Sequence, residues 1–221
     1  MCGRFTLRTE PSEFWPADQL SLFQPKYNIA PSQMVSAVRE IGGENRPASL
    51  QWGLVPFWAK DAKIGYRTIN ARSESVAEKP TFRDAFRQRR CLVLADGYYE
   101  WKAIGKQKQP YYIRLQDGRP FAFAGLWESW MGPPGERRDA PLETCTVITT
   151  TSNKLTAGVH DRMPAILHAD DLPFWLDSDF QSTSKLTSLL RPFESDEMCM
   201  HPVSTIVNKP ANDVPECVEE V

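Results

Sequence analysis

The chain opens with the sequence MCGRF, and the cysteine at position 2 is its first candidate for chemistry. If Met1 is removed, Cys2 becomes N-terminal and carries an α-amine and a thiol on adjacent carbons. Their ordinary pKa values of about 8 and about 8.5 leave both groups partly deprotonated near neutral pH. Together they can trap an aldehyde as a five-membered thiazolidine ring. The alternative is that position 2 merely holds a small residue.

Three other stretches hold side chains suited to handling protons or orienting a substrate. Glu100, in ADGYYEW, has aromatic neighbours, and partial desolvation by such rings raises the pKa of a carboxyl and suits it to general acid work. His160, in GVHDRMP, titrates near neutral pH and could shuttle protons. Asn70, in TINARSES, offers an amide donor and acceptor. A solvent-facing glutamate, an exposed histidine and an ordinary surface asparagine are the alternatives.

Some arginine and aromatic residues are of types that could contact nucleic acid, with ordinary surface arginines and core aromatic rings as the alternatives. The guanidinium groups of Arg72 and Arg162 suit a phosphate or a carboxylate. Trp58 is the best candidate for an exposed ring that stacks on an unpaired base. The net charge of −2 argues against a strongly basic protein, but residues 210–221 hold four carboxylates and no lysine or arginine. The remaining body has 26 basic and 24 acidic residues, so a local basic face is permitted.

The composition predicts a globular chain that uses no metal or other cofactor. Its 221 residues suit one domain, and no apolar run approaches the roughly 20 residues of a membrane span. No secretory signal is apparent, which favours the cytoplasm. The five cysteines contain no C-x-x-C pair and there are only three histidines, so neither a disulfide framework nor a zinc site is expected.

The periodicity predicts an α+β, β-rich single domain over residues 1–209, followed by an acidic, mobile tail at 210–221. We expect a hairpin turn at residues 116–119, and a capping box in which Thr81 pairs with Asp84. Strands are predicted at 47–54, 91–101, 109–115, 119–127, 144–150 and 201–207, and helices at 81–88, 170–177 and 182–193.

Several motifs follow one another in an order that resembles the SRAP family, the SOS-response-associated peptidases. The resemblance runs from residue 2 to about residue 207 and implies barrel-like sheets flanked by short helices. The motifs are MCGRF, YNIAPSQ, WGLVPFW, INARSES, FRDAFRQRRCLVLADGYYEWK, QPYYI, FAFAGLWE, TVITTTSN, HDRMPAIL and HPVS.

The resemblance implies a function and a mechanism. Family members remove Met1, apparently by their own activity, and use Cys2 to trap the ring-opened aldehyde of an abasic site in single-stranded DNA. The thiazolidine DNA–protein cross-link shields the site from strand cleavage. A protein bound to DNA in this way is expected at the nucleoid. Cys2 matches the nucleophile, Glu100 the acid that assists opening of the deoxyribose ring, His160 the proton-handling histidine, and Asn70 the asparagine that orients the reacting end.

The resemblance also implies residues that bind DNA. Arg4, Arg72 and Arg162 match positions expected to hold phosphates. Pro31 and Trp58 match a wedge that keeps flanking bases splayed. Some bacterial members carry two adjacent tryptophans at the wedge, whereas Ala59 follows Trp58 here. The resemblance therefore does not decide whether this chain splays DNA strands.

Three other functions remain as alternatives. Glutamine amidotransferases also begin MCG, and their N-terminal cysteine attacks a glutamine amide, although their other motifs are missing here. A non-covalent reader of modified DNA bases would not need Cys2. A protease acting on other proteins could use Cys2, Glu100 and His160, but self-removal of Met1 needs fewer assumptions.

Overall fold

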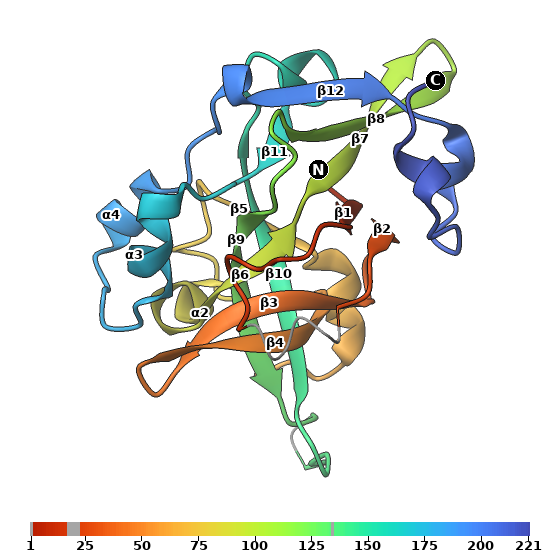
Figure 1. Cartoon of the computed structure of the whole chain (residues 1–221). Coiled ribbons are helices and arrows are strands. Elements are labelled where there is room, and N and C mark those ends of the chain that lie inside the picture. The colour runs from red at the N-terminus through yellow and green to blue at the C-terminus, as the bar shows by residue number, and fades with distance from the viewer. Residues whose placement is uncertain (1, 17–22, 134) are drawn as a thin grey trace.

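The computed structural model describes residues 2–16, 23–133 and 135–221, and within them the chain is dominated by two β-sheets (Figure 1). This confirms the predicted α+β, β-rich class. The strands are β1 (Phe5–Leu7), β2 (Lys26–Ile29), β3 (Met34–Ile41), β4 (Glu44–Trp52), β5 (Asn70–Arg72), β6 (Arg90–Ala95), β7 (Gly97–Ile104), β8 (Gln107–Leu115), β9 (Phe121–Trp130), β10 (Leu142–Thr151), β11 (Arg162–Pro164) and β12 (Met198–Pro202).

The first sheet has the order β12-β8-β7-β1-β2, with every neighbouring pair antiparallel. In the second sheet, each strand of the series β10-β4-β3-β6-β9 pairs with the next one, and the last strand, β9, also pairs with the first, β10. These five strands therefore close on themselves, which gives the expected barrel-like sheet. The short strands β5 and β11 add to opposite edges of β10 beyond the barrel.

The chain crosses between the sheets at two places where the sequence suggested continuity or a hairpin. The run at 91–101, predicted as one strand, breaks at Asp96 into β6 of the second sheet and β7 of the first. The predicted hairpin turn at 116–119 instead leads from β8 to β9, which lie in different sheets and do not pair. Alternating hydrophobicity predicts a strand but does not say which sheet the strand joins.

Three short helices cover one side of the second sheet (Figure 1): α2 (Arg83–Gln88), α3 (Leu172–Leu176) and α4 (Thr183–Ser188). The predicted capping box is wrong, because Phe82 is the N-cap of α2 and no side chain caps it. At the other end, buried Arg90 donates hydrogen bonds to the carbonyls of Phe86 and Arg87 in α2 and of Trp175 in α3. A cation at two helix C-termini satisfies carbonyls that the helices cannot bond themselves.

The main core lies between the sheets and contains large aromatic residues in edge contact. The ring of Phe5 in β1 lies 5.0 Å from Trp52 and 5.6 Å from Phe123, centroid to centroid. Cys91 and Cys145 are fully buried, as small core residues. Burial of the Phe5 side chain contributes about 1.5 to 3 kcal/mol, so the core itself holds the N-terminal strand in place.

The last twelve residues are not the loosely attached tail that their acidic composition predicted. Tyr27 and Asn28 of β2 donate backbone hydrogen bonds to the Asp213 carboxylate. Cys217 is fully buried beside Tyr99 and Tyr112, and Val221 donates a backbone hydrogen bond to Pro202. The carboxylates at 210–221 therefore stand on a segment that packs against the first sheet.

Two other features complete the fold. The strand predicted at 201–207 starts earlier, as β12, and its second half is a 3-10 helix. The 3-10 helices are η1 (Ala62–Arg67), η2 (Thr156–Gly158), η3 (Ala169–Asp171), η4 (Ser195–Glu197), η5 (Thr205–Asn208) and η6 (Pro215–Val218). Within the described ranges, no helix is long and apolar enough to cross a membrane.

Candidate functional site

Cys2 lies in the interior of the molecule. It comes three residues before β1, which runs between β7 and β2 in the first sheet. The backbone pairing with β7 extends beyond β1 to Arg4, whose carbonyl oxygen accepts a hydrogen bond from the Tyr99 backbone amide. The Cys2 residue is 0% exposed. Burial and the nearby Glu100 carboxyl raise the pKa of its thiol well above the ordinary value. The thiol is therefore protonated at neutral pH and needs a base before it can act as a nucleophile.

Asn70 holds the Cys2 backbone. It is the first residue of β5, which pairs with β10 in parallel register, and its Nδ2 atom donates to the Cys2 carbonyl oxygen at 2.6 Å. The Asn70 Oδ1 atom is buried and has no hydrogen-bond partner among the residues that the structure describes. Asn70 can therefore fix the N-terminal residue with one end of its amide and accept a hydrogen bond from a bound molecule with the other.

Glu100 contributes a buried carboxyl to an open cleft. It lies on β7, next to β1, and the residue is 3% exposed. Burial raises the pKa of this carboxyl from 4.5 to about 7. The solvent-facing alternative is thus wrong, because the aromatic strand desolvates the side chain as the sequence suggested. A carboxyl with this pKa can both donate and accept a proton near pH 7.

His160 lines the same cleft from the turn that precedes β11. Its Nδ1 atom accepts a hydrogen bond from the Arg162 backbone amide at 3.0 Å and lies 2.9 Å from an Asp161 carboxylate oxygen. Burial lowers the pKa of the ring, although Asp161 opposes this effect. The lowered pKa keeps the ring neutral at pH 7, with one nitrogen that carries a proton and one that can accept a proton. His160 can therefore donate or receive a proton in the cleft.

The cleft has a volume of about 460 Å³ and three further wall residues that the sequence analysis did not single out. They are Trp101, Lys108 and Asn208, and the Trp101 indole donates to the Asn208 side chain at 2.7 Å. Lys108 is exposed on β8, and Asn208 ends η5. Trp101 follows Glu100 in the chain, whereas nothing local in the sequence marks Lys108 or Asn208. The pairing of β7 with β8 and the return of the C-terminal segment bring these two to Glu100.

The three predicted phosphate-binding arginines differ in their surroundings. Arg72 is exposed at the end of β5. Arg162 is 8% exposed, and its guanidinium forks onto the Glu74 carboxylate at 2.7 and 3.0 Å. Arg4 is 9% exposed and donates to the Asn28 side chain and the Val207 carbonyl, both at 2.6 Å. Arg72 alone of the three thus presents its side chain freely to a ligand.

Pro31 and Trp58 lie outside the cleft that Glu100 and His160 line. Pro31 is half-buried in the turn between β2 and β3, and Trp58 is 44% exposed after β4, while Trp52 is buried. Ala59 is 2% exposed and packs against Val55 and Trp130. The residue at the second wedge position therefore faces inward.

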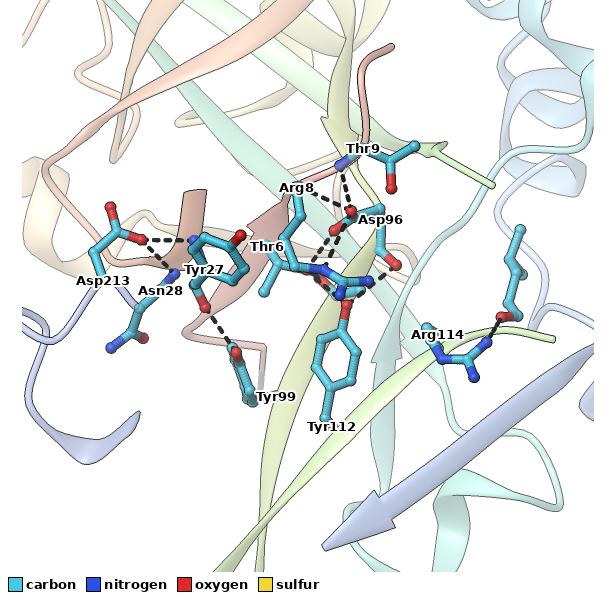
Figure 2. Close-up of polar contacts among 12 residues, drawn as sticks. Thr6, Arg8, Thr9, Tyr27, Asn28, Asp96, Tyr99, Tyr112, Arg114 and Asp213 are labelled. Atoms are coloured by element: carbon cyan, nitrogen blue, oxygen red, sulfur yellow. Dashed lines mark hydrogen bonds and ion pairs between the residues drawn. The ribbon is translucent and has the colours of Figure 1, made fainter. Parts of the chain in front are cut away.

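A buried carboxylate fixes β1, the strand that follows Cys2 (Figure 2). Asp96 is fully buried between β6 and β7; one of its oxygens accepts from the Thr6 hydroxyl at 2.5 Å, and the other accepts from the backbone amides of Arg8 and Thr9 at 2.8 Å each. Hydrogen bonds to an ionised acceptor are among the stronger ones in proteins. Asp96, where the chain passes from the second sheet to the first, therefore also anchors β1.

A second set of polar contacts ties the other side of β1 to the C-terminal segment. Asn28, next to Arg4, donates from Nδ2 to the carbonyls of Val207, Lys209 and Asn212. Figure 2 shows Asp213 beside the backbone of Tyr27 and Asn28, and the Tyr99 hydroxyl donating to the Tyr27 carbonyl. These contacts join β2, β7 and the final segment around the residues that precede β1.

The assembled groups can carry out addition to a carbonyl. The site offers a cysteine at position 2 held at its carbonyl, a carboxyl titrating at about 7 and a neutral imidazole beside an open cleft. Met1, whose removal would free the Cys2 amine, lies outside the described residues. No group of three or more histidine, cysteine or acidic side chains that could hold a metal ion occurs in the described parts of the chain.

Known proteins share this chain's sequence and fold over nearly its whole length. It is 44% identical to abasic site processing protein YoqW of Bacillus subtilis over 99% of each chain. It is 35% identical to abasic site processing protein HMCES of Xenopus tropicalis, over 94% of this chain and 69% of that one. A protein of Bacteroides thetaiotaomicron of known crystal structure superposes with a TM-score of 0.86 at 29% identity, over 100% of both chains.

The sequence profile of one family also matches residues 1–210, which span all the candidate site residues. The profile is described as SOS response associated peptidase, or SRAP. The match and the close relatives both agree with the motif order read from the sequence. This chain therefore belongs to the SRAP family.

Proposed function

We propose that this protein processes abasic sites in single-stranded DNA, and that it does so by forming a thiazolidine cross-link through Cys2 after Met1 is removed. The observation that carries the proposal is the buried Cys2, held by Asn70, next to a carboxyl whose pKa lies at about 7 on an open cleft. The names of the relatives, abasic site processing proteins, support the choice of substrate.

The first step is opening of the abasic deoxyribose ring. Protonated Glu100 donates its proton to the ring oxygen while the C1′ hydroxyl gives its own proton to a water molecule, so that the C1′–O4′ bond breaks and an aldehyde forms. Near pH 7 about half of the Glu100 carboxyls carry the proton this step needs. The unpartnered Oδ1 of Asn70 is suited to accept from a sugar hydroxyl and so to hold the sugar beside Cys2.

The second step joins the protein to the sugar. The Cys2 amine adds to the C1′ aldehyde, and loss of one water molecule gives an imine. The thiol then adds across the C=N bond, its proton passing to the nitrogen, so amine, thiol and aldehyde become a thiazolidine and water. Ionised Glu100 or neutral His160 can accept the thiol proton. Since both nucleophiles belong to one residue, ring closure gains the high effective concentration of an intramolecular attack.

Removal of Met1 must precede these steps. While Met1 is attached, the Cys2 nitrogen is an amide and cannot form an imine. Self-processing would use water, which adds to the Met1 carbonyl as the Met1–Cys2 bond breaks, with a proton delivered to the Cys2 nitrogen. Glu100, whose carboxyl acts on the Cys2 thiol, lines one cleft with His160, and the two side chains are suited to move those protons.

Intact-mass spectrometry tests the proposal. The purified protein is weighed before and after incubation with single-stranded DNA that contains one abasic site, with Cys2→Ala and Cys2→Ser as matched variants. We expect wild type without Met1 to gain the mass of the oligonucleotide minus water, and neither variant to form this heat-stable adduct. Processed wild type that gains no mass would contradict the proposal and would lead to a glutaminase assay and to binding of modified bases.

A further inference from the structure

Tyr98 is a fully buried polar residue on the strand that carries Glu100. It lies on β7, opposite Phe5 of β1, and the residue is 0% exposed. Side chains alternate between the two faces of a strand, so Tyr98 and Glu100 share one face of β7 and Tyr99 lies on the other. The packing agrees, because Tyr98 belongs to the main core together with Cys2, whereas Tyr99 belongs to a separate core that the C-terminal segment completes.

The ring of Tyr98 is used by the fold, but its hydroxyl group is not. The ring packs edge-on against Phe123, with the two centroids 6.2 Å apart. The hydroxyl oxygen is buried and has no hydrogen-bond partner in the described ranges of the chain. A buried hydroxyl without a partner costs free energy, and phenylalanine at this position would pack the same ring without that cost. The hydroxyl group therefore points to a function rather than to the packing of the core.

The same hydroxyl group lies within electrostatic reach of two groups of the reaction site. Burial raises the pKa of the Tyr98 phenol well above its ordinary value, and the Cys2 thiol and the Glu100 carboxyl raise it further. The phenol therefore keeps its proton throughout the neutral range. It can donate a hydrogen bond near Cys2 without giving that proton up.

The Cys2 sulfur needs a hydrogen-bond donor when it reacts. In the structure the thiol donates to the Arg4 carbonyl oxygen at 3.7 Å, and an acceptor at this place favours the thiol over the thiolate. Ring closure requires the sulfur to lose its proton as it attacks the imine carbon. Negative charge then develops on a buried atom that also feels the Glu100 carboxyl. A preorganised donor aimed at this charge lowers the barrier to the attack.

Two other donors near Cys2 are already engaged. The Asn70 Nδ2 atom donates to the Cys2 carbonyl oxygen at 2.6 Å. The Arg4 guanidinium donates to the Asn28 side chain at 2.6 Å. The Tyr98 hydroxyl, by contrast, is bonded to none of the residues that the structure describes, so it can donate to the sulfur without first breaking a hydrogen bond.

We infer that the Tyr98 hydroxyl donates a hydrogen bond to the Cys2 sulfur while the thiazolidine ring closes. The sulfur attacks the imine carbon, its proton passes through Glu100 or His160 to the imine nitrogen, and the C=N bond becomes a single bond. Tyr98 keeps its own proton throughout and stabilises the charge on the sulfur. The inference rests on the proposed function for the reaction, and it assigns Tyr98 to ring closure rather than to opening of the sugar or formation of the imine.

The test separates the imine from the closed ring. An imine is hydrolysed on heating unless borohydride has first reduced it to an amine, whereas the thiazolidine survives heating without reduction. The protein is incubated with the single-stranded abasic oligonucleotide, and samples taken over time are divided between heating alone and reduction followed by heating. The ratio of the two yields of adduct gives the fraction whose ring has closed.

Tyr98→Phe is compared with Tyr99→Phe, which removes a hydroxyl group from the other face of the same strand. We expect Tyr98→Phe to form the imine at the wild-type rate and to close the ring about tenfold or more slowly, since the loss of one donor to a developing charge has an effect of this size. Tyr99→Phe should close the ring as wild type does. Cys2→Ser sets the limit in which the adduct survives only after reduction.

Urea denaturation of the same variants distinguishes this role from a structural one. The Tyr98 hydroxyl has no hydrogen bond to lose within the described parts of the chain, so Tyr98→Phe should unfold at the same urea concentration as wild type or at a higher one. Tyr99→Phe loses the 2.7 Å bond to the Tyr27 carbonyl and should unfold at a lower concentration. A Tyr98→Phe variant that is less stable as well as slow would overturn the inference.

Ring closure at the wild-type rate in Tyr98→Phe would also overturn the inference, while the proposed function would stand. Equal slowing of imine formation and ring closure would do the same, because the effect would then not be confined to the sulfur. Wild type that yields no adduct even after reduction would instead refute the proposed function, and this inference with it.

Discussion

Replacing Glu100 with glutamine should make the protein more stable at alkaline pH while impairing its chemistry. The residue is 3% exposed, and burial raises the pKa of the carboxyl from 4.5 to about 7. At about 1.4 kcal/mol for each tenfold change in the ionisation constant, ionised Glu100 costs the folded state about 3 kcal/mol. Glutamine has nearly the same shape and never ionises, so the variant avoids this cost.

The sign follows from proton binding. Between pH 4.5 and about 7 the folded protein holds the Glu100 proton and the unfolded chain releases it, so the contribution of this group to the free energy of unfolding falls as the pH rises through that window. The variant should therefore equal wild type near pH 4.5. Its advantage should grow to about 3 kcal/mol at pH 8.

Urea denaturation followed by tryptophan fluorescence at several pH values measures this difference, on material whose N-terminus has been established by mass. Glu78→Gln, at an exposed position, is the control and should show a difference of less than about 0.5 kcal/mol at every pH. A Glu100→Gln difference that stays constant from pH 4.5 to pH 8 would refute the reasoning, because burial would then not be shifting the ionisation of Glu100.

The reaction should respond in the opposite direction. Since the proposed mechanism uses protonated Glu100 to open the sugar, the rate of cross-linking by wild type should decline above about pH 7. The variant should react about 100-fold or more slowly and without that decline, since general acid–base catalysis contributes factors of this size. A variant that is more stable and equally fast would remove Glu100 from the mechanism.

Three further changes test positioning and binding. Asn70→Ala removes the 2.6 Å bond to the Cys2 carbonyl and should slow adduct formation by up to about 100-fold with little effect on DNA affinity; equal losses of both would mean a general defect. Arg72→Ala should flatten the salt dependence of single-strand binding by about 0.7, and an unchanged slope would exclude a phosphate contact. Asp96→Asn leaves at least one buried donor of β1 without an anionic acceptor and should lower the free energy of unfolding by about 1 to 3 kcal/mol in urea denaturation; an unaltered midpoint would contradict the anchoring role.

The sequence predicted which residues lie near one another better than it predicted what surrounds them. Cys2, Asn70, Glu100 and His160 each stand in a short distinctive motif, and the structure gathers these four around one cleft or its border. The desolvation of Glu100 could be foreseen because its immediate neighbours in the chain are aromatic. Local composition fails where a contact depends on a distant segment.

Arg162 and the C-terminal segment illustrate that failure. The sequence offers Arg162 for an anion, but the fold brings Glu74 to both arms of its guanidinium, so a phosphate would have to displace a carboxylate. Four carboxylates at 210–221 suggested a mobile tail, yet Asp213 accepts two backbone hydrogen bonds from β2, and Cys217 is buried. In both cases a charge that looks solvated in the sequence is satisfied by a partner far away in the chain.

The position of β1 explains why so much of the molecule is committed to holding its first residues. Chain termini ordinarily fray, and a nucleophile on a fraying end would sample many positions relative to Glu100. Here the N-terminal strand is an interior strand of its sheet, its ring at Phe5 lies in the core, and Asp96 holds the residues that follow it. Local opening of β1 thus requires breaking core and buried polar contacts together, which raises its free energy towards that of global unfolding. In the proposed reaction, Cys2 would be held in this way as firmly as an internal residue, and removal of Met1 would give its amine the reactivity that only a chain end provides.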